Sequence, residues 1–406
     1  MPTPCAAFVT RTRTGILDLR LFMTQAVDPS RGYRQLSILL IASIVASQPP
    51  AVRTLANSEA TLRQPLLQIL YGIRELSDGS LLLVDGKDRR AFRVDRELSR
   101  ADQVGAVGSG PGEYLRPNAV FPLSGDTSAI RDGGSGNRLL LVTPRGTTGR
   151  FLPASGLATP RDARVFPSAV DAVDGSGNYY ATVRPSMVVP GNRDSGDTLA
   201  IVRWSPRNPA LKLIAFLPTE PRPSTGVVTV SGMRVSPDAS NVPFWSKPQW
   251  AVSLDGRIAV AHHTPYRVEL FDSTGRRIAD TRPASAPVRV TEGHKKEWLD
   301  AYNAREEEDR RRFGGSTRPP AAFPQYLPAF LHDALHFDPS GRLWIHKTTA
   351  AGAPATFDVI DTRGRVSFRV MHTTAARLAG FGSDGAVYFA RPNADGFEHL
   401  ERYRVR

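Results

Sequence analysis

One local pattern returns six times between residue 65 and the end of this 406-residue chain. Each copy opens with a turn that combines Asp or Ser with Gly, continues as a β-type apolar run, and adds a polar loop and a second apolar strand. The turns and their runs are Ser77–Gly79 with Ser80–Val84, Gly134–Gly136 with Arg138–Val142, Asp174–Gly177 with Asn178–Val183, Leu254–Gly256 with Arg257–Ala261, Asp338–Gly341 with Arg342–Ile345, and Ser383–Gly385 with Ala386–Ala390. Short strands repeated every few tens of residues are typical of propeller blades. We therefore predict an all-β fold, a six-bladed β-propeller.

The second copy departs from the pattern, because its Gly-rich stretch suits a loop before an outer strand. Its inner strands are expected at Ala119–Leu123 and Thr127–Ile130. The alternating terminal run Leu400–Arg406 predicts a last strand, and a strand near Leu66–Leu70 is expected to complete the last blade and close the ring without a free edge. The expected propeller spans 66–406, after a leader at 1–47 and a linker at 48–65.

One segment breaks the β pattern. Thr291–Phe313 contains no Pro and carries Trp298, Leu299 and Tyr302 at helical spacing, followed by Glu/Arg pairs four residues apart. We predict a helix inserted between two blades, within an insertion at 291–315, whose first half docks on the ring through Trp298.

A glycine-rich loop lies between the first two copies. Val107–Arg116 reads Val-Gly-Ser-Gly-Pro-Gly-Glu-Tyr-Leu-Arg, and its glycines and proline predict a tight turn. Together with Leu76–Asp85 and Arg90–Asp95, this loop resembles the opening blade of the NHL-like six-bladed β-propeller family of bacterial envelope proteins. The resemblance covers residues 66–406 and implies a propeller fold and an envelope location, but no particular ligand.

The N-terminal region indicates export. An uncharged run, Leu36–Ala46, follows Arg31 and Arg34. A charged region followed by an apolar region is the pattern of a secretory signal. The true start is then Met23 or Met1, and the mature chain is expected to begin between Ser47 and Asn57. The alternative is a buried segment of the fold. We expect a periplasmic or secreted protein with no stable membrane span after leader removal.

The cysteine content and the net charge limit the classes of function that this chain can have. Cys5 is the only cysteine, which excludes a disulfide framework and a cysteine-based zinc site. The net charge of +13 comes mainly from arginine. It fits either an anionic ligand or charges spread over a solvated surface. No basic run with interleaved aromatic residues marks a nucleic-acid path, since Arg310–Arg312 follows four acidic residues. We expect no nucleic acid as partner, and RNA binding conflicts with export.

Candidate site residues follow from strand direction. The strand after each turn ends at the same edge of its blade, because antiparallel strands alternate in direction. A ring of polar, mainly basic groups is therefore expected around the central mouth, together with the glycine-rich loop. The candidates for ligand binding are Asp85, Glu113, Arg184, His262, His263, His346, Lys347 and Arg391. Strands often end in polar residues, and Glu113 also suits hydrogen bonds within its own loop.

Motifs for catalysis and metal binding are weak. His332 and His336 are four residues apart, and on a helix they could bind one metal ion together. His336 is expected in a strand, however, where residues four apart lie too far from each other to share a metal. Asp171–Asn178 resembles a calcium loop yet has Thr182 in place of the closing Glu. GxSxG and HExxH are both missing. We predict a monomeric binding or interaction protein without a cofactor, with an unknown ligand that one hypothesis makes anionic. The alternative is a divalent-metal-dependent hydrolase or lactonase, to which Asp85, Glu113, Asn118 and Asp132 would contribute.

Overall fold

The computed structural model divides into two units. It describes residues 7–11, 17–21, 50–134, 138–152, 156–157, 164–165, 170–192, 196–219, 228–230, 233–235, 242–313, 322–373, 376–393 and 395–405. The first unit, Met1–Pro50, contains the antiparallel pair β1 (Ala7–Arg11) and β2 (Leu17–Leu21). The hydrophobic run of the expected leader, 36–46, lies outside the described residues. The second unit, Ala51–Arg406, is the propeller.

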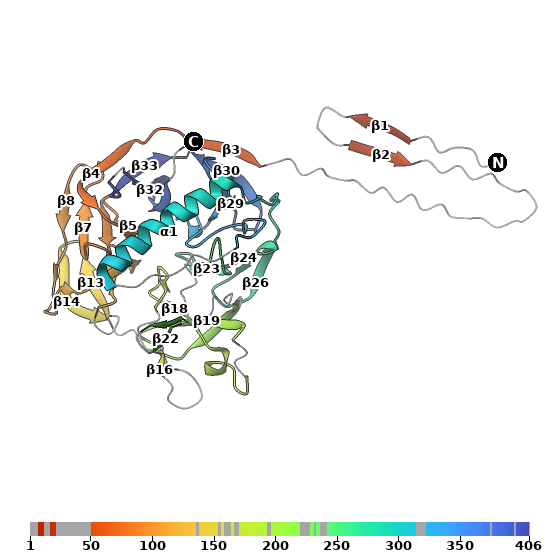
Figure 1. The fold of residues 1–406 in the computed structure, drawn as a ribbon. Coiled ribbons are helices and arrows are strands. Elements are labelled where there is room, and N and C mark those ends of the chain that lie inside the picture. Colours follow the sequence, from red (N-terminus) through yellow and green to blue (C-terminus); the bar gives the residue numbers. More distant parts are fainter. Residues whose placement is uncertain are drawn as a thin grey trace, which may run out of the picture. The chain divides into compact units, whose positions relative to one another are not determined.

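Six sheets of antiparallel strands form the ring of the second unit (Figure 1). Four blades consist of successive strands alone: β5–β8 (Leu70–Glu75, Leu81–Asp85, Arg90–Val94, Ala101–Gln103), β11–β14 (Pro117–Pro122, Ser128–Asp132, Arg138–Thr143, Gly146–Leu152), β17–β20 (Ala172–Val173, Tyr179–Val183, Thr198–Trp204, Lys212–Pro218) and β23–β26 (Gln249–Val252, Ile258–His263, Tyr266–Phe271, Arg277–Thr281). The fifth is β27–β30 (Leu335–Phe337, Leu343–Lys347, Ala355–Ile360, Val366–His372), and the sixth begins with β31–β33 (Arg377–Phe381, Ala386–Pro392, Glu398–Arg404). The predicted six-bladed propeller is confirmed, and so are the inner strands expected for the second blade.

Two N-terminal strands extend the last two blades. β4 (Ala60–Leu67) is the outermost strand of the sixth blade and pairs antiparallel with β33, which places Leu62 opposite Leu400. β3 (Ala51–Leu55) adds to the fifth blade, parallel to β30. The expected closure therefore exists, but most of the closing strand precedes the expected Leu66–Leu70, since only Leu66 and Leu67 belong to β4 and Leu70 already begins the first blade. Most of the segment expected as a linker belongs to the ring.

The second strand of each blade lies at the centre of the packing. Every residue of β6, from Leu81 to Asp85, is buried, as are Ile258 to Ala261 in β24. A strand with a neighbouring blade on each face needs apolar side chains on both faces, which explains the continuous apolar runs in the sequence. Aromatic rings fill the seam between the fifth and sixth blades, where Phe357 packs against Phe389 at 5.7 Å between ring centroids.

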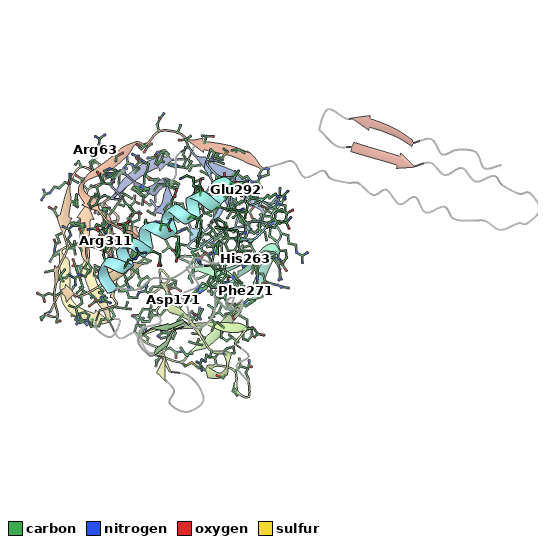
Figure 2. The ribbon with its side chains drawn as sticks, in the orientation of Figure 1. Arg63, Asp171, His263, Phe271, Glu292 and Arg311 are labelled. Atoms are coloured by element: carbon green, nitrogen blue, oxygen red, sulfur yellow. The ribbon has the colours of Figure 1, made fainter. Side chains whose placement is uncertain are left out.

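Helix α1 (Glu292–Phe313) interrupts the ring between the fourth and fifth blades, as predicted. It crosses in front of the ring in the view of Figure 1, and Glu292 and Arg311 mark its two ends in Figure 2. His294 Nε2 donates to the Thr349 carbonyl at 3.0 Å, and Trp298 stacks on Tyr302, which is buried. The first half of α1 is therefore held by packing.

The glycine-rich loop connects the first two blades and is fixed by hydrogen bonds. Its short strands β9 (Ala106–Val107) and β10 (Glu113–Tyr114) pair in parallel. The Tyr114 hydroxyl, fully buried, donates to the Val104 carbonyl at 2.9 Å and accepts from the Ala91 amide at 3.0 Å. Glu113 accepts from the Gly110 amide at 2.7 Å, so its expected role within the loop is confirmed.

The remaining described elements are short. They are the strand pairs β15 (Gly156–Leu157) with β16 (Arg164–Val165) and β21 (Val228–Val230) with β22 (Met233–Val235), and the 3-10 turn η2 (Pro185–Met187). Among the described residues, no helix combines the length and the apolar content that a bilayer crossing requires.

Candidate functional site

Strand direction defines two rims of the ring. The innermost strand of each blade begins where the second strand ends, as the pairs Leu70–Asp85, Gln249–Ala261 and Arg377–Ala390 show. We call this edge the mouth rim, and the edge formed by the turns between first and second strands the opposite rim. The expectation that second strands end at a common edge is met, and β10 leads to the same rim just before β11.

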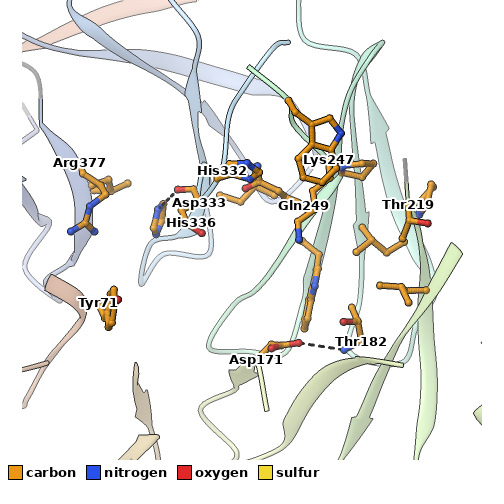
Figure 3. A pocket seen from close by; sticks show the side chains of 18 of the residues that line it. Tyr71, Asp171, Thr182, Thr219, Lys247, Gln249, His332, Asp333, His336 and Arg377 are labelled. Atoms are coloured by element: carbon orange, nitrogen blue, oxygen red, sulfur yellow. Dashed lines mark hydrogen bonds between the residues drawn. The ribbon is translucent and has the colours of Figure 1, made fainter. Parts of the chain in front are cut away.

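A cavity of about 810 Å³ opens at the mouth rim (Figure 3). Residues at or near the start of the innermost strands form much of its wall, with side chains from five of the six blades and the loops between them. Its polar and aromatic lining includes Tyr71, Asp171, Thr182, Thr219, Trp245, Lys247, Gln249, Trp250, His332, Asp333, His336 and Arg377. The cavity is therefore the candidate functional site.

Two contacts fix the wall at the first and sixth blades. Arg377 donates to the Leu70 carbonyl at 2.7 Å and to both carboxylate oxygens of Glu398 at 3.0 Å. Tyr71 is half exposed at the cavity, and its ring lies over Gly86, where a Cβ atom would come within 1.8 Å of the ring. Only glycine leaves room for this aromatic face.

A second set of contacts fixes the wall at the fourth and fifth blades. Gln249 accepts from the Ala334 amide at 2.9 Å and donates to the Leu331 carbonyl, so it joins its strand to the next blade. His336 Nε2 donates to the Asp333 carbonyl at 3.1 Å, which leaves Nδ1 as an acceptor in the neutral ring. Loss of solvent lowers the pKa of His336, so this ring is mainly neutral at pH 7.

Asp171 and Lys247 are two opposite charges of the cavity, which Asp333 and Arg377 also line. Loss of solvent raises the pKa of Asp171, while Arg131 and Lys247 oppose that shift. The carboxylate accepts weakly from the Thr182 amide at 3.4 Å and lies 3.9 Å from Arg131, so it keeps unused acceptor capacity. Lys247 is exposed. The pair can hold a polar ligand, but no nucleophile–base contact is present between them.

None of the eight residues predicted from the sequence lines this cavity. Three are engaged in ion pairs: Arg391 with Glu401 at 2.7 Å, His262 with Glu269 at 3.0 Å, and Lys347 with buried Asp358 at 3.5 Å. Glu113 is bound within its loop, and His263 lines a different pocket. These side chains were expected at the mouth, but neighbouring strands supply partners that turn them away from it.

The other three candidates also have local explanations. Asp85 is buried and accepts from the amides of Gln68, Ile69, Lys87 and Asp88, so it fixes the chain on both sides of β6. The ring of His346 stacks on Phe357 at 4.7 Å, and burial lowers its pKa to about 4. Arg184 is exposed at the mouth rim, just before η2.

The residues that line the mouth come from positions the sequence analysis passed over. Of its metal and calcium candidates, His332, His336 and Asp171 do reach the cavity. The informative positions are the first residues of each innermost strand, which is the strand that leads into the turn with Asp or Ser and Gly. Those residues face the channel because the innermost strands surround it.

The metal hypotheses find little support in these contacts. Within the described ranges no group of three or more His, Cys, Asp or Glu side chains could hold a metal ion. Asp132 accepts from the amides of Leu115, Arg116 and Gly134, as Asp85 accepts from amides in the first blade, and it also pairs with Arg138 at 2.8 Å. Asp174 caps the turn that resembles a calcium loop, by accepting from Ser176 and Asn178.

Both rims contain ion pairs as well as exposed charges without an ion pair in the described residues. At the opposite rim, turn carboxylates pair with arginines: Asp78 with Arg93, Asp255 with Arg257, Asp272 with Arg276, Asp338 with Arg342, Asp361 with Arg365, and Asp384 with Arg404. At the mouth rim, Arg89, Arg116, Arg184 and Lys247 are exposed and make no ion pair in the described part of the chain. The opposite rim also has exposed cations without an ion pair in the described residues, at Arg145, Arg207, Lys212 and Arg363, and the mouth rim has such carboxylates, at Asp333 and Asp395. What distinguishes the mouth is therefore that one such cation, Lys247, lines the cavity.

Comparisons with known proteins find remote structural likeness and no related sequence. No family model and no curated protein sequence matches this chain. Among solved structures, it is similar to a gluconolactonase from Xanthomonas campestris (11% identity, TM-score 0.41, covering 88% of this chain and 99% of the other). It is also similar to a member of the DUF4221 family from Bacteroides vulgatus (9% identity, TM-score 0.43, 87% and 96%) and to PQQ-bound aldose sugar dehydrogenase from Streptomyces coelicolor (13% identity, TM-score 0.41, 86% and 98%). Likeness at this level supports no inference about function.

Proposed function

We propose that this protein is an exported binding protein that holds an anionic ligand in the mouth of its propeller. The observation that carries the proposal is Lys247, an exposed cation that lines the cavity at the mouth and makes no ion pair among the described residues. A cavity of about 810 Å³ at that rim is large enough for a small ligand. The aromatic faces of Tyr71 and Trp250 suit a ligand with a ring.

Lys247 is the cation to test, because it lines the cavity and has a matched control. Lys212 begins β20 at the opposite rim and is exposed as well, so Lys212→Glu makes the same charge change far from the mouth. The probe is pyranine, an aromatic trisulfonate, titrated by fluorescence anisotropy at low ionic strength. We expect Lys247→Glu to weaken binding by about tenfold, which corresponds to ~1.4 kcal/mol, and Lys212→Glu to change it less than about twofold.

Salt provides an independent readout. Raising the ionic strength from ~0.01 M to ~0.15 M shortens the Debye length from ~30 Å to ~8 Å, so pyranine affinity should fall. Equal weakening by the two lysine variants would refute a mouth site, because the effect would then follow net charge alone. A divalent ion retained in stoichiometric amount through gel filtration would support the hydrolase alternative instead.

Export and family membership are further parts of the proposal. The charged and then apolar order before Ser47 supports a cleaved leader, and the Gly110–Tyr114 loop supports membership in the NHL-like family. Since β3 begins at Ala51 and pairs with β30, cleavage near Ala56 would remove a strand of the fifth blade. N-terminal sequencing of exported protein should therefore find a start from Ser47 to Ala51, and a start before Leu36 would contradict export by this leader.

A further inference from the structure

A second cavity, of about 1090 Å³, lies beside the mouth and has a different chemistry. It is bounded by 242–246, by 263–266 at the end of the fourth blade, by 285–288 and by 322–329, with Thr348. Its wall contains the rings of Phe244, Trp245, Tyr266, Phe323 and Tyr326 and five prolines, but not one Asp, Glu, Lys or Arg side chain. In a chain with 22% charged residues, such a lining favours an uncharged ligand, with His263 as its one ionisable side chain apart from tyrosines.

The walls of this cavity are held in place by packing. Phe244 lies 6.0 Å from Phe323, which in turn packs edge-on against Trp298 of α1 at 5.6 Å. On the other side, the Tyr266 hydroxyl donates to Asp358 at 3.3 Å, and Thr348 donates to the Pro328 carbonyl at 2.5 Å. The cavity is therefore preformed rather than a gap between loose loops.

The segment 244–246 is in a costly conformation. Phe244 has a φ of 54°, which is unusual for a bulky residue. The next two residues bury polar atoms, Trp245 Nε1 and Ser246 Oγ, that have no hydrogen-bond partner among the described residues. Each unsatisfied buried group costs about 1–3 kcal/mol. Features of this kind gather at ligand clamps, and here all three belong to the wall of one cavity.

We propose that this cavity is a second ligand site, for an uncharged and largely apolar small molecule that carries a hydrogen-bond acceptor. The Ser285 hydroxyl and the Gln325 side-chain amide are exposed, line the cavity and make no hydrogen bond within the described residues, so both can donate to that acceptor. The aromatic rings and prolines cover the apolar body of the ligand. Rotation of the indole would also bring Trp245 Nε1 to the acceptor.

The test uses a matched pair of dyes. Nile red is neutral and has a carbonyl acceptor, whereas Nile blue has nearly the same shape and a positive charge. We expect saturable binding of Nile red with a blue-shifted emission, and at least about tenfold weaker binding of Nile blue, because burying an unpaired charge is costly. Equal affinity for the two dyes, or no saturable binding of Nile red, would overturn the proposal.

Two alanines provide the matched variants. Ala286 lines the cavity and is exposed, so Ala286→Glu introduces a carboxylate into the uncharged wall without removing a contact. Ala284 is also exposed but does not line it. Ala286→Glu should weaken Nile red binding at least about tenfold, and Ala284→Glu less than about twofold. Unchanged binding by Ala286→Glu would rule this cavity out. Lys247→Glu should leave Nile red binding intact, which separates this site from the mouth.

Discussion

Closure of the ring by β4 can be tested by shortening one side chain, Leu62. This residue is 1% exposed and packs in the apolar cluster between the sixth and first blades, with Leu67, Leu81 and Leu400. It stands opposite Leu400 of β33, so it joins the N-terminal strand of the propeller to its last strand. Leu62→Ala removes this contact and leaves the backbone pairing in place.

The expected cost follows from the burial of Leu62. Buried Leu→Ala changes cost ~2.7–5 kcal/mol, with the larger values where the surroundings cannot collapse into the cavity. Leu62 is packed between strands of two blades, and we expect about 3 kcal/mol. That is a large share of the ~5–15 kcal/mol that stabilises a typical domain. Because β4 holds the two ends of the ring together, the loss should fall on the whole propeller.

Urea unfolding measures this cost, with Arg63→Ala as the control. Arg63 is the next residue of β4, is exposed and makes no ion pair in the described part of the chain (Figure 2). Its replacement should change the free energy of unfolding by less than about 0.5 kcal/mol. Leu62→Ala should lower the midpoint of one cooperative transition with an unchanged slope. A loss below about 1 kcal/mol, or a separate early transition, would refute closure through β4.

Two further predictions concern a buried carboxylate and the inserted helix. Burial raises the pKa of Asp132, but hydrogen bonds from Arg138 and three backbone amides outweigh it and leave the pKa below its ordinary value. Its stabilising effect is therefore complete above the unfolded-state pKa and is lost as the pH falls through the folded-state pKa. Asp132→Asn should cost about 1–3 kcal/mol at pH 7 and less near pH 3 in urea unfolding, and a pH-independent difference would contradict this role. Trp298→Ala removes the edge-on contact of α1 with Phe323 and should speed proteolysis at Arg310 and Arg311 without changing the urea midpoint of the ring; unchanged cleavage would show that Trp298 does not dock α1.

The blades were predictable because their buried strands carry two local signals at once. Ile258–Ala261, for example, is a continuous apolar run directly after an Asp-Gly turn, and Gly256 adopts the positive φ of 80° that this turn requires. The exact closing strand was not predictable in the same way. Leu66 and Leu67 end β4, Leu70 begins β5, and only Gln68 and Ile69 separate them, so the two strands resemble one apolar run.

The directions of the side chains at the mouth rim could not be predicted from any single strand. His262, Lys347 and Arg391 were placed at the correct rim, but their directions depend on carboxylates seven to eleven residues later, on the next strand of the same blade: Glu269, Asp358 and Glu401. An antiparallel neighbour brings such residues diagonally across from one another, and the contact with the carboxylate then competes with the channel for each side chain. Lys247 lies in a loop before its strand and makes no ion pair in the described part of the chain, so it remains available at the cavity. For a propeller of this kind, the cations to examine first are therefore those before the innermost strands, where no second strand runs alongside to neutralise them.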